Sequence, residues 1–184
     1  GKEYFNWLFR KCANMMAGIS KIPKPVIAEV QGVAAAAGCQ LVASCDLALA
    51  SQEATFGVNG VNIGLFCSTP MVALSRNISR KKTFEMLVTG EFLTADDAQK
   101  EGLINKVTEA NNLNAETMKM AVTISEKLSS AVKIGKEAFY KQLELSVDDA
   151  YDYTAGVITE NMLHRDTEEG ISAFIEKRLP NWED

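Results

Sequence analysis

A run of very small residues, Val33 to Gly38, stands between an expected strand and an expected helix. The β-branched segment 26–30 predicts a short strand that ends at Gly32, and the helix after the run continues through Gln40. The first backbone N–H groups of such a helix have no partner within the helix, so they can receive negative charge that develops on a carbonyl oxygen. The alanines would equally let the helix pack closely against the strand, and the residues alone leave both interpretations open.

Four polar side chains that follow this run in the sequence are neutral. Gln40, Asn59, Asn62 and Ser68 carry amides or a hydroxyl, which can orient a substrate or hold a water molecule but do not exchange a proton near neutral pH. A site built from them would bind and polarise a ligand rather than transfer protons. An inert, repacked pocket would explain the same residues, so both interpretations stay open.

Groups for acid–base, nucleophilic or metal chemistry are few. His164 is the single imidazole, which leaves almost no material for a zinc site or for a Ser–His or Cys–His pair, and we expect no metal. The four cysteines contain no C-x-x-C pair and are expected to be buried free thiols in a reducing compartment. Cys39 directly follows the small-residue run and Cys67 lies further along the chain, but no base is placed by sequence to form a thiolate at either position.

Other ionisable residues that could transfer a proton are expected to face solvent. Strand alternation directs Glu29 toward solvent, and Glu85, Glu91 and His164 are expected on the surface. None of them is therefore a candidate for proton transfer.

Composition excludes several function classes. The chain has 184 residues with 47% apolar content, and 19 basic against 24 acidic residues give a net charge of −5. These proportions fit one globular domain, or one domain with an appendage, and supply no patch that could neutralise nucleic-acid phosphates. The longest apolar stretch, 33–50, is interrupted by polar residues, so no membrane span is expected.

The elements around the run alternate between strands and helices. Apolar residues at helical spacing predict a first helix over 5–19, which Pro23 and Pro25 end. Segments 46–50 and 55–56 predict two further buried strands.

Beyond Pro70 the chain is expected to be mainly helical. Thr94 and Asp97 form a capping box, and Gly102 stands where a glycine would close that helix. Further predicted elements are a strand at 103–107 and helices at 113–128, 131–141, 147–164 with Ser146 as N-cap, and from Thr167 onward. This order predicts an α/β core followed by an α-helical tail.

Several ordered motifs resemble the crotonase (enoyl-CoA hydratase/isomerase) superfamily. They are KPVIAEVQG from Lys24, GCQL from Gly38, the segment 84–107, and the tail from Asp166 to Pro180. The resemblance implies a ClpP/crotonase-like spiral of ββα repeats. It divides the chain into a partial core at 1–110 and a helical trimerisation region at 111–184, with the first strands of the fold expected to be absent.

The resemblance also implies roles for individual residues. The turn at Ala37 would supply one backbone N–H of an oxyanion hole that polarises an acyl-CoA thioester carbonyl, the other coming from an earlier loop expected to be absent. Two glutamates deliver water in hydratases of this family, and their positions are occupied by Gln40 and Gly60. The residues expected to bind substrate are Ala34, Gly38, Asn59, Asn62 and Lys177.

These residues lead to an expectation about function. Loss of both glutamates, each worth about 10²–10⁴ in rate, predicts an acyl-CoA-binding protein that is not an ordinary hydratase. A non-catalytic binding module and an enolate-forming enzyme, such as a decarboxylase of malonyl-type thioesters, remain alternatives, so the question of catalysis stays open. The resemblance further implies no cofactor besides the CoA thioester, a homotrimer or dimer of trimers, and a mitochondrial matrix location in a eukaryote or a cytoplasmic one otherwise.

Overall fold

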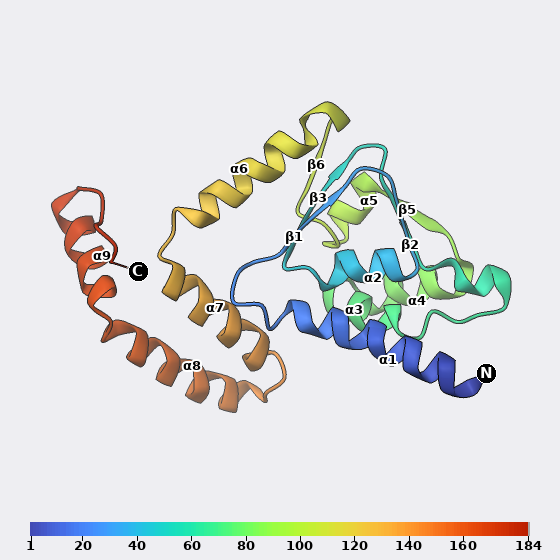
Figure 1. Ribbon diagram of the computed structural model, residues 1–184, viewed down its shortest axis with the longest axis horizontal. Coiled ribbons are helices and arrows are strands. Elements are labelled where there is room, and N and C mark those ends of the chain that lie inside the picture. Colours follow the sequence, from blue (N-terminus) through green and yellow to red (C-terminus); the bar gives the residue numbers. More distant parts are fainter. Residues whose placement is uncertain (184) are drawn as a thin grey trace. The chain divides into compact units, whose positions relative to one another are not determined.

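A computed structural model describes residues 1–183 as a mixed α/β chain that divides into two compact units, residues 1–121 and 122–184 (Figure 1). The boundary falls inside helix α6 (Leu113–Ser125). None of the helices in residues 1–183 combines the length and apolarity that a membrane crossing requires.

The first unit is built from strand pairs followed by helices. After α1 (Lys2–Ile19), the chain forms β1 (Ile27–Val30), β2 (Val33–Ala35) and α2 (Ala37–Ser44). The pattern then repeats with β3 (Leu47–Ser51), β4 (Thr55–Gly57), the 3₁₀ turn η1 (Asn59–Ile63) and α3 (Pro70–Asn77). The remaining elements are α4 (Arg80–Thr89), β5 (Phe92–Thr94), α5 (Ala95–Lys100), β6 (Lys106–Thr108) and η2 (Ala110–Asn112).

The two strands of each pair belong to different sheets. One sheet has the order β1-β3-β6 and is parallel throughout, whereas the other has the order β2-β4-β5 with β5 antiparallel. The central strand β3 is buried along four of its five residues, as expected for a parallel strand covered on both faces. This alternation is the expected ββα repeat.

A shared core connects these repeats to α2. Its members come from both sheets and from α2, α3, α4 and α5, and the fully buried ones include Cys39, Ala50, Phe56 and Leu74. Many of the core residues are alanines, which lets the helices approach the strands closely.

Helix capping follows the sequence signals. Thr94 Oγ1 accepts a hydrogen bond from Asp97 N at 3.2 Å and donates to Asp97 Oδ2, which confirms the capping box. Gly102 has φ +85°, a left-handed conformation that glycine adopts without steric cost. Ser146 caps α8 by accepting from Asp149 N at 3.3 Å, as predicted.

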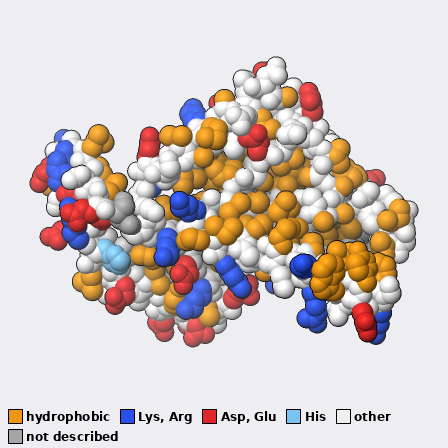
Figure 2. All heavy atoms as spheres, viewed as in Figure 1, with side chains coloured by type: hydrophobic (Ala, Val, Ile, Leu, Met, Phe, Trp, Pro, Cys, Tyr) orange, Lys and Arg blue, Asp and Glu red, His pale blue; other side chains and the backbone are white. Residues whose placement is uncertain are grey.

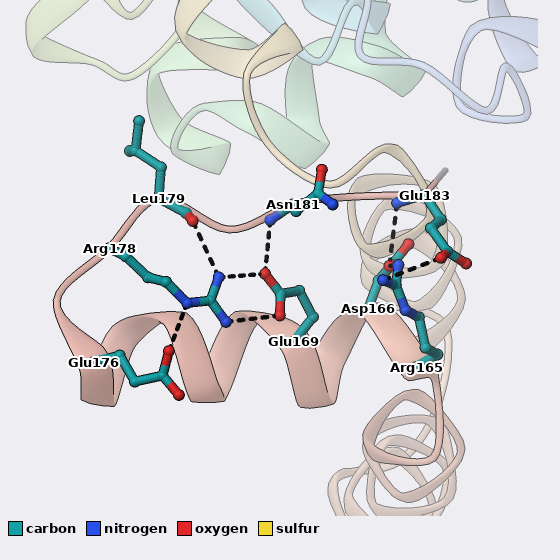
Figure 3. Close-up of polar contacts among 8 residues, drawn as sticks. All are labelled: Arg165, Asp166, Glu169, Glu176, Arg178, Leu179, Asn181 and Glu183. Carbon is teal, nitrogen blue, oxygen red and sulfur yellow. Dashed lines mark hydrogen bonds and ion pairs between the residues drawn. The ribbon is translucent and has the colours of Figure 1, made fainter.

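The second unit contains α7 (Ser129–Gln142), α8 (Val147–Met162) and α9 (Arg165–Glu176), with α7 packed against α8. After α9 the chain reverses at Lys177, whose φ is +56°, and residues 178–183 run back along the helix (Figure 3). Arg178 holds this return segment, because its guanidinium donates two hydrogen bonds to the Glu169 carboxylate and one to Glu176. Asn181 N donates to the same Glu169 carboxylate at 2.7 Å.

Several predicted bounds differ from the observed ones, three of them by three residues. The strand expected at 103–107 is Lys106–Thr108, the helix expected to reach residue 128 ends at Ser125, and the helix expected from residue 5 begins at Lys2. Strands β2 and β5, each three residues long, were not predicted. The expected domain boundary after residue 110 rests on the family resemblance and stays a prediction.

Candidate functional site

The turn before α2 has an unusual backbone. Ala36 is its N-cap residue with φ +48° and ψ −110°, a conformation that a residue with a side chain rarely adopts. Two hydrogen bonds hold the turn, because Ala36 N donates to Gly57 O at 2.8 Å and Ala36 O accepts from Gln40 N at 3.0 Å. Such strain costs about 1–3 kcal/mol and persists only where the surroundings enforce it.

The turn leaves the start of α2 open. Ala37 and Gly38 are both exposed, and within residues 1–183 neither N–H donates a hydrogen bond. No side chain caps α2 and its first turn carries no acidic residue, so nothing of its own neutralises the positive end of the helix dipole. The predicted oxyanion donor, Ala37 N–H, is therefore available to an acceptor on a ligand.

Gln40 lies one turn into α2, on the side of Ala36. Only 4% of the residue is exposed, and its amide oxygen Oε1 is buried without a hydrogen-bond partner. Side chains of a helix lean toward its N-terminus, so the Gln40 amide is expected on the N-terminal side of its own Cα. The amide is neutral and cannot serve as a general acid or base.

Gly60, the position of the family's second glutamate, has no room for a side chain. It is a buried residue of η1, and a Cβ atom added there would lie 2.8 Å from both Leu65 O and Cys67 Sγ. Leu65 N also donates to Gly60 O at 2.9 Å, which holds the loop against η1. Segment 65–67 therefore occupies the volume that a carboxylate side chain would need.

The Cys39 thiol, in the first turn of α2, is neutral. Cys39 is fully buried, and burial together with the proximity of Cys67 raises the pKa of its thiol to about 12, although a hydrogen bond involving the Gly57 backbone acts in the opposite direction. A thiol with this pKa is protonated at neutral pH and is not a nucleophile.

The other predicted binding residues differ in how far they are from the turn along the chain and in how deeply they are buried. Ala34 is buried in β2 beside Phe56, and Asn59 is partly buried at the start of η1. The Asn62 side chain lies against Gly90, where an added Cβ would be 2.6 Å from Asn62 Oδ1. Lys177 belongs to the second unit, while the other predicted site residues belong to the first.

The dismissed candidates occupy exposed positions. Glu29 is exposed and accepts a hydrogen bond from Asn114 at 3.4 Å, and Glu85 pairs with Lys82 at 2.6 Å. Glu91, Ser68 and His164 are also exposed. Among residues 1–183, no group of three or more His, Cys, Asp or Glu side chains could hold a metal ion.

Sequence reasoning missed Ala36 and Gly57. Ala36 has an alanine side chain despite its positive φ, so residue type gave no signal of its conformation. Gly57 accepts the Ala36 N–H and packs against Phe92, whose ring carbons would lie 2.7 Å from an added Cβ. The glycine after Phe56 was the available signal, because a glycine within a strand often marks a close approach of two chain segments.

The family model described as enoyl-CoA hydratase/isomerase matches residues 7–184. The chain is 50% identical to the mitochondrial enoyl-CoA hydratase domain-containing protein 3 of Xenopus laevis and 48% identical to that of Homo sapiens, over 99% of its length. It spans about three fifths of these relatives, 62% and 60% of their lengths. Segments 38–51 and 58–70 by themselves resemble this relative, in agreement with the comparison.

Solved structures agree with the sequence comparison. An enoyl-CoA hydratase from Mycobacterium smegmatis matches with a TM-score of 0.98 and 50% identity, over all of this chain and 72% of the other. Human enoyl-CoA hydratase domain-containing protein 3 matches with a TM-score of 0.96 and 47% identity, over 99% of this chain and 72% of the other. The expected crotonase fold is thereby confirmed.

Proposed function

Because the chain belongs to the enoyl-CoA hydratase/isomerase family, we propose that the open start of α2 binds the thioester carbonyl of an acyl-CoA. The observation that carries the proposal is the pair of exposed, unpartnered N–H groups of Ala37 and Gly38 beside the strained Ala36 turn. Ala37 N–H donates to the carbonyl oxygen, and the helix dipole favours the negative charge on it. Ala34, Asn59 and Asn62 contribute to the surrounding substrate site.

In this proposal, the protein does not act as an ordinary hydratase. Gln40 cannot exchange protons, Gly60 has no space for a carboxylate, and the Cys39 thiol is protonated. A general acid–base group is worth about 10²–10⁴ in rate, so the loss of two leaves little hydration. What the site retains is carbonyl polarisation, which serves binding and would also serve enolate formation without a protein base.

The family resemblance implies that a basic residue of the C-terminal tail contacts the phosphates of the CoA. Arg178 is held by Glu169 and Glu176, whereas Lys177 forms no ion pair within the described chain and is the available cation. Lys177 is therefore the residue proposed to contact CoA phosphates. No cofactor other than the CoA thioester enters the proposal.

The proposal includes assembly as a homotrimer or a dimer of trimers. The second unit exposes large apolar side chains, among them Leu163 at 76%, Phe174 at 85% and Leu179 at 90%. Burial of such residues between copies would supply association energy. Light scattering of the purified protein tests this part of the proposal.

The names of the vertebrate relatives support a mitochondrial location if the source is eukaryotic.

Binding and hydration of crotonyl-CoA by the full-length protein, measured on the same sample, test the proposed function. We expect micromolar binding with no hydration above background. Hydration at an ordinary enzymatic rate would refute the argument from Gln40 and Gly60. Release of CO₂ from methylmalonyl-CoA would assign enolate chemistry to the site, and its absence would leave acyl-CoA binding as the function.

A matched pair of proline variants tests the donor itself. Ala37→Pro removes the proposed N–H at the first position of α2, where proline is compatible with a helix, and Arg80→Pro makes the same change in α4. We expect about tenfold weaker crotonyl-CoA binding for Ala37→Pro and no change for Arg80→Pro. Gly38→Leu provides a second route, because a side chain there extends into open space and blocks the approach of a ligand.

A further inference from the structure

Segment 90–92, which joins the end of α4 to β5, contacts the candidate site at two separate places. Phe92 packs against Gly57, and Gly90 packs against the Asn62 side chain. Gly90 has no side chain and Phe92 has only a hydrocarbon ring, so neither carries a polar side chain that could bind a ligand. These two residues can therefore influence the site through the residues that they hold.

Phe92 restrains the strand that holds the strained turn. In the antiparallel pair of β4 with β5, Phe92 lies opposite Gly57, and its ring carbons would be 2.7 Å from a Cβ added at Gly57. The Gly57 carbonyl accepts the Ala36 N–H at 2.8 Å, and the residue after Ala36 carries the proposed donor. The ring therefore limits movement of the Gly57 carbonyl, and with it the direction of the Ala37 N–H.

Gly90 restrains η1 through Asn62. Gly90 ends α4 in a left-handed conformation with φ +69°, and its N–H donates to Met86 O at 3.1 Å. The whole Asn62 amide covers it, since Oδ1, Nδ2 and Cγ would be 2.6, 2.8 and 2.9 Å from an added Cβ. The amide has this place only because Gly90 lacks a side chain, so a larger residue there would displace Asn62.

Segment 90–92 is itself held at both ends. Thr89 Oγ1 donates to Glu85 O at 2.8 Å and accepts from Glu91 N at 3.2 Å, which ties the segment to α4. The residue after the segment, Leu93, is buried opposite Phe56 in the core. A donor that polarises a carbonyl must be held to within about 0.5 Å, and a segment fixed in this way can supply that support.

We propose that segment 90–92 positions the acyl-CoA site, with Phe92 orienting the Ala37 donor through Gly57 and Gly90 orienting Asn62. This proposal rests on the proposed function, because it requires the thioester carbonyl to accept from the Ala37 N–H. Gly90 and Phe92 are positioning residues, which act through their neighbours.

Phe92→Ala and its matched control Phe84→Ala, both in the full-length protein, test the first contact. Each removes an exposed phenyl ring, but Phe84 lies on α4, away from Gly57 in the sheet. We expect Phe92→Ala alone to bind crotonyl-CoA about tenfold more weakly, with binding of CoA alone unchanged. In difference infrared spectra, the isotope-labelled carbonyl of bound crotonyl-CoA should shift toward its frequency in solution, because a misaligned donor polarises it less. Phe92→Tyr keeps the ring and should restore both values.

Gly90→Ala and Gly102→Ala test the second contact. Both glycines have a left-handed conformation, with φ +69° and +85°, so alanine strains the backbone at either position. An added Cβ at Gly102 would have its nearest neighbour at 3.8 Å, so only Gly90→Ala displaces a site residue. We expect both variants to lose stability and only Gly90→Ala to bind crotonyl-CoA more weakly, by about fivefold.

Several results would overturn the proposal. They are an unchanged crotonyl-CoA affinity and carbonyl frequency in Phe92→Ala, an equal loss in Phe84→Ala, and an equal weakening of crotonyl-CoA and CoA binding, which would show a merely structural role. If Phe92→Ala folds poorly, equal binding by Gly90→Ala and Gly102→Ala decides against the proposal. A wild type that binds crotonyl-CoA no better than CoA alone, with the carbonyl frequency unshifted, would instead overturn the proposed function.

Discussion

Two positions at which hydratases of the family have glutamate carry other residues in this chain, and the two replacements have opposite consequences. Gln40 keeps a polar side chain in the first turn of α2, and its buried oxygen lacks a partner within residues 1–183. Gly60 has no side chain, and the loop at Leu65 and Cys67 fills the space where one would stand. The first position therefore retains a group that can recognise a ligand, whereas the second has become part of the packed core.

The largest expected effect concerns the thiol of Cys39, which precedes Gln40 in the chain and lies near Cys67. Burial of Cys39 and the proximity of Cys67 raise its pKa to about 12, so its thiolate fraction at pH 8 is about 10³ lower than that of an ordinary cysteine. Alkylation of the native protein at pH 8 should modify the partly exposed Cys12 and Cys45 first and Cys39 only after denaturation. Peptide mass spectrometry checks the order, and rapid labelling of native Cys39 would show that this part of the core is open.

The second prediction tests whether the Gly60 position is filled. Gly60→Glu forces a side chain against Leu65 O and Cys67 Sγ, so we expect a loss of about 3 kcal/mol in the free energy of unfolding and no gain of hydration. Urea denaturation provides the measurement. Gly32→Glu is the matched control, because a Cβ at Gly32 meets nothing within 4 Å. Equal stability of both variants would contradict the packing described for Gly60.

The third prediction concerns Gln40, the first of the two positions compared above. Gln40→Met removes a buried oxygen that has no partner, so we expect the unliganded protein to become more stable by about 1 kcal/mol. The increase would mean that the amide is kept for binding at a cost in stability. Thermal denaturation of the unliganded protein measures the change. A destabilised Gln40→Met would indicate that the amide stabilises the unliganded fold.

The elements that could be predicted from sequence are those determined by local interactions. Ser146 and the Thr94–Asp97 pair cap helices within three residues of themselves, and the apolar spacing of α1 spans only its own turns. Strands β2 and β5 are three residues long and exist because each pairs with β4, which lies elsewhere in the chain. Their segments carry too few residues to show an alternating pattern.

The candidate site was predictable in its residues but not in its geometry. The small-residue run correctly indicated a helix that contains Gln40, although this helix begins within the run, at Ala37. The conformation of Ala36 depends on the Gly57 carbonyl, which a separate strand contributes. Gln40 was recognisable as a neutral substitute for glutamate, but its unsatisfied oxygen depends on what surrounds it in three dimensions. The filled volume at Gly60 depends on a loop whose path no local signal predicts.

The smallest expected effect lies in the second unit, where charge rather than close packing holds the chain. Hydrogen bonds from Arg178 and from Asn181 N lower the pKa of Glu169 to about 2, compared with about 4.3 for an unperturbed glutamate (Figure 3). Because the folded pKa is depressed, the contribution of this carboxylate to stability is complete above about pH 4.3 and is lost as the pH falls toward 2. The return segment, including Trp182 against Gly170, should detach over this range.

Fluorescence of Trp182 in a Trp7→Phe background reports this detachment without interference from the chain's only other tryptophan. Glu169→Gln should give at pH 7 the Trp182 signal that the parent gives near pH 2, with helix content by circular dichroism unchanged. Glu176→Gln is the matched control, since it removes one bond to Arg178 and leaves the bidentate pair of Arg178 with Glu169.

Exposed apolar side chains are abundant in both units (Figure 2). Exposure alone therefore does not mark the tail as different. A Trp182 signal that ignores Glu169→Gln would show that apolar contact holds the return segment, and the contrast between a packed first unit and a charge-held tail would then fail.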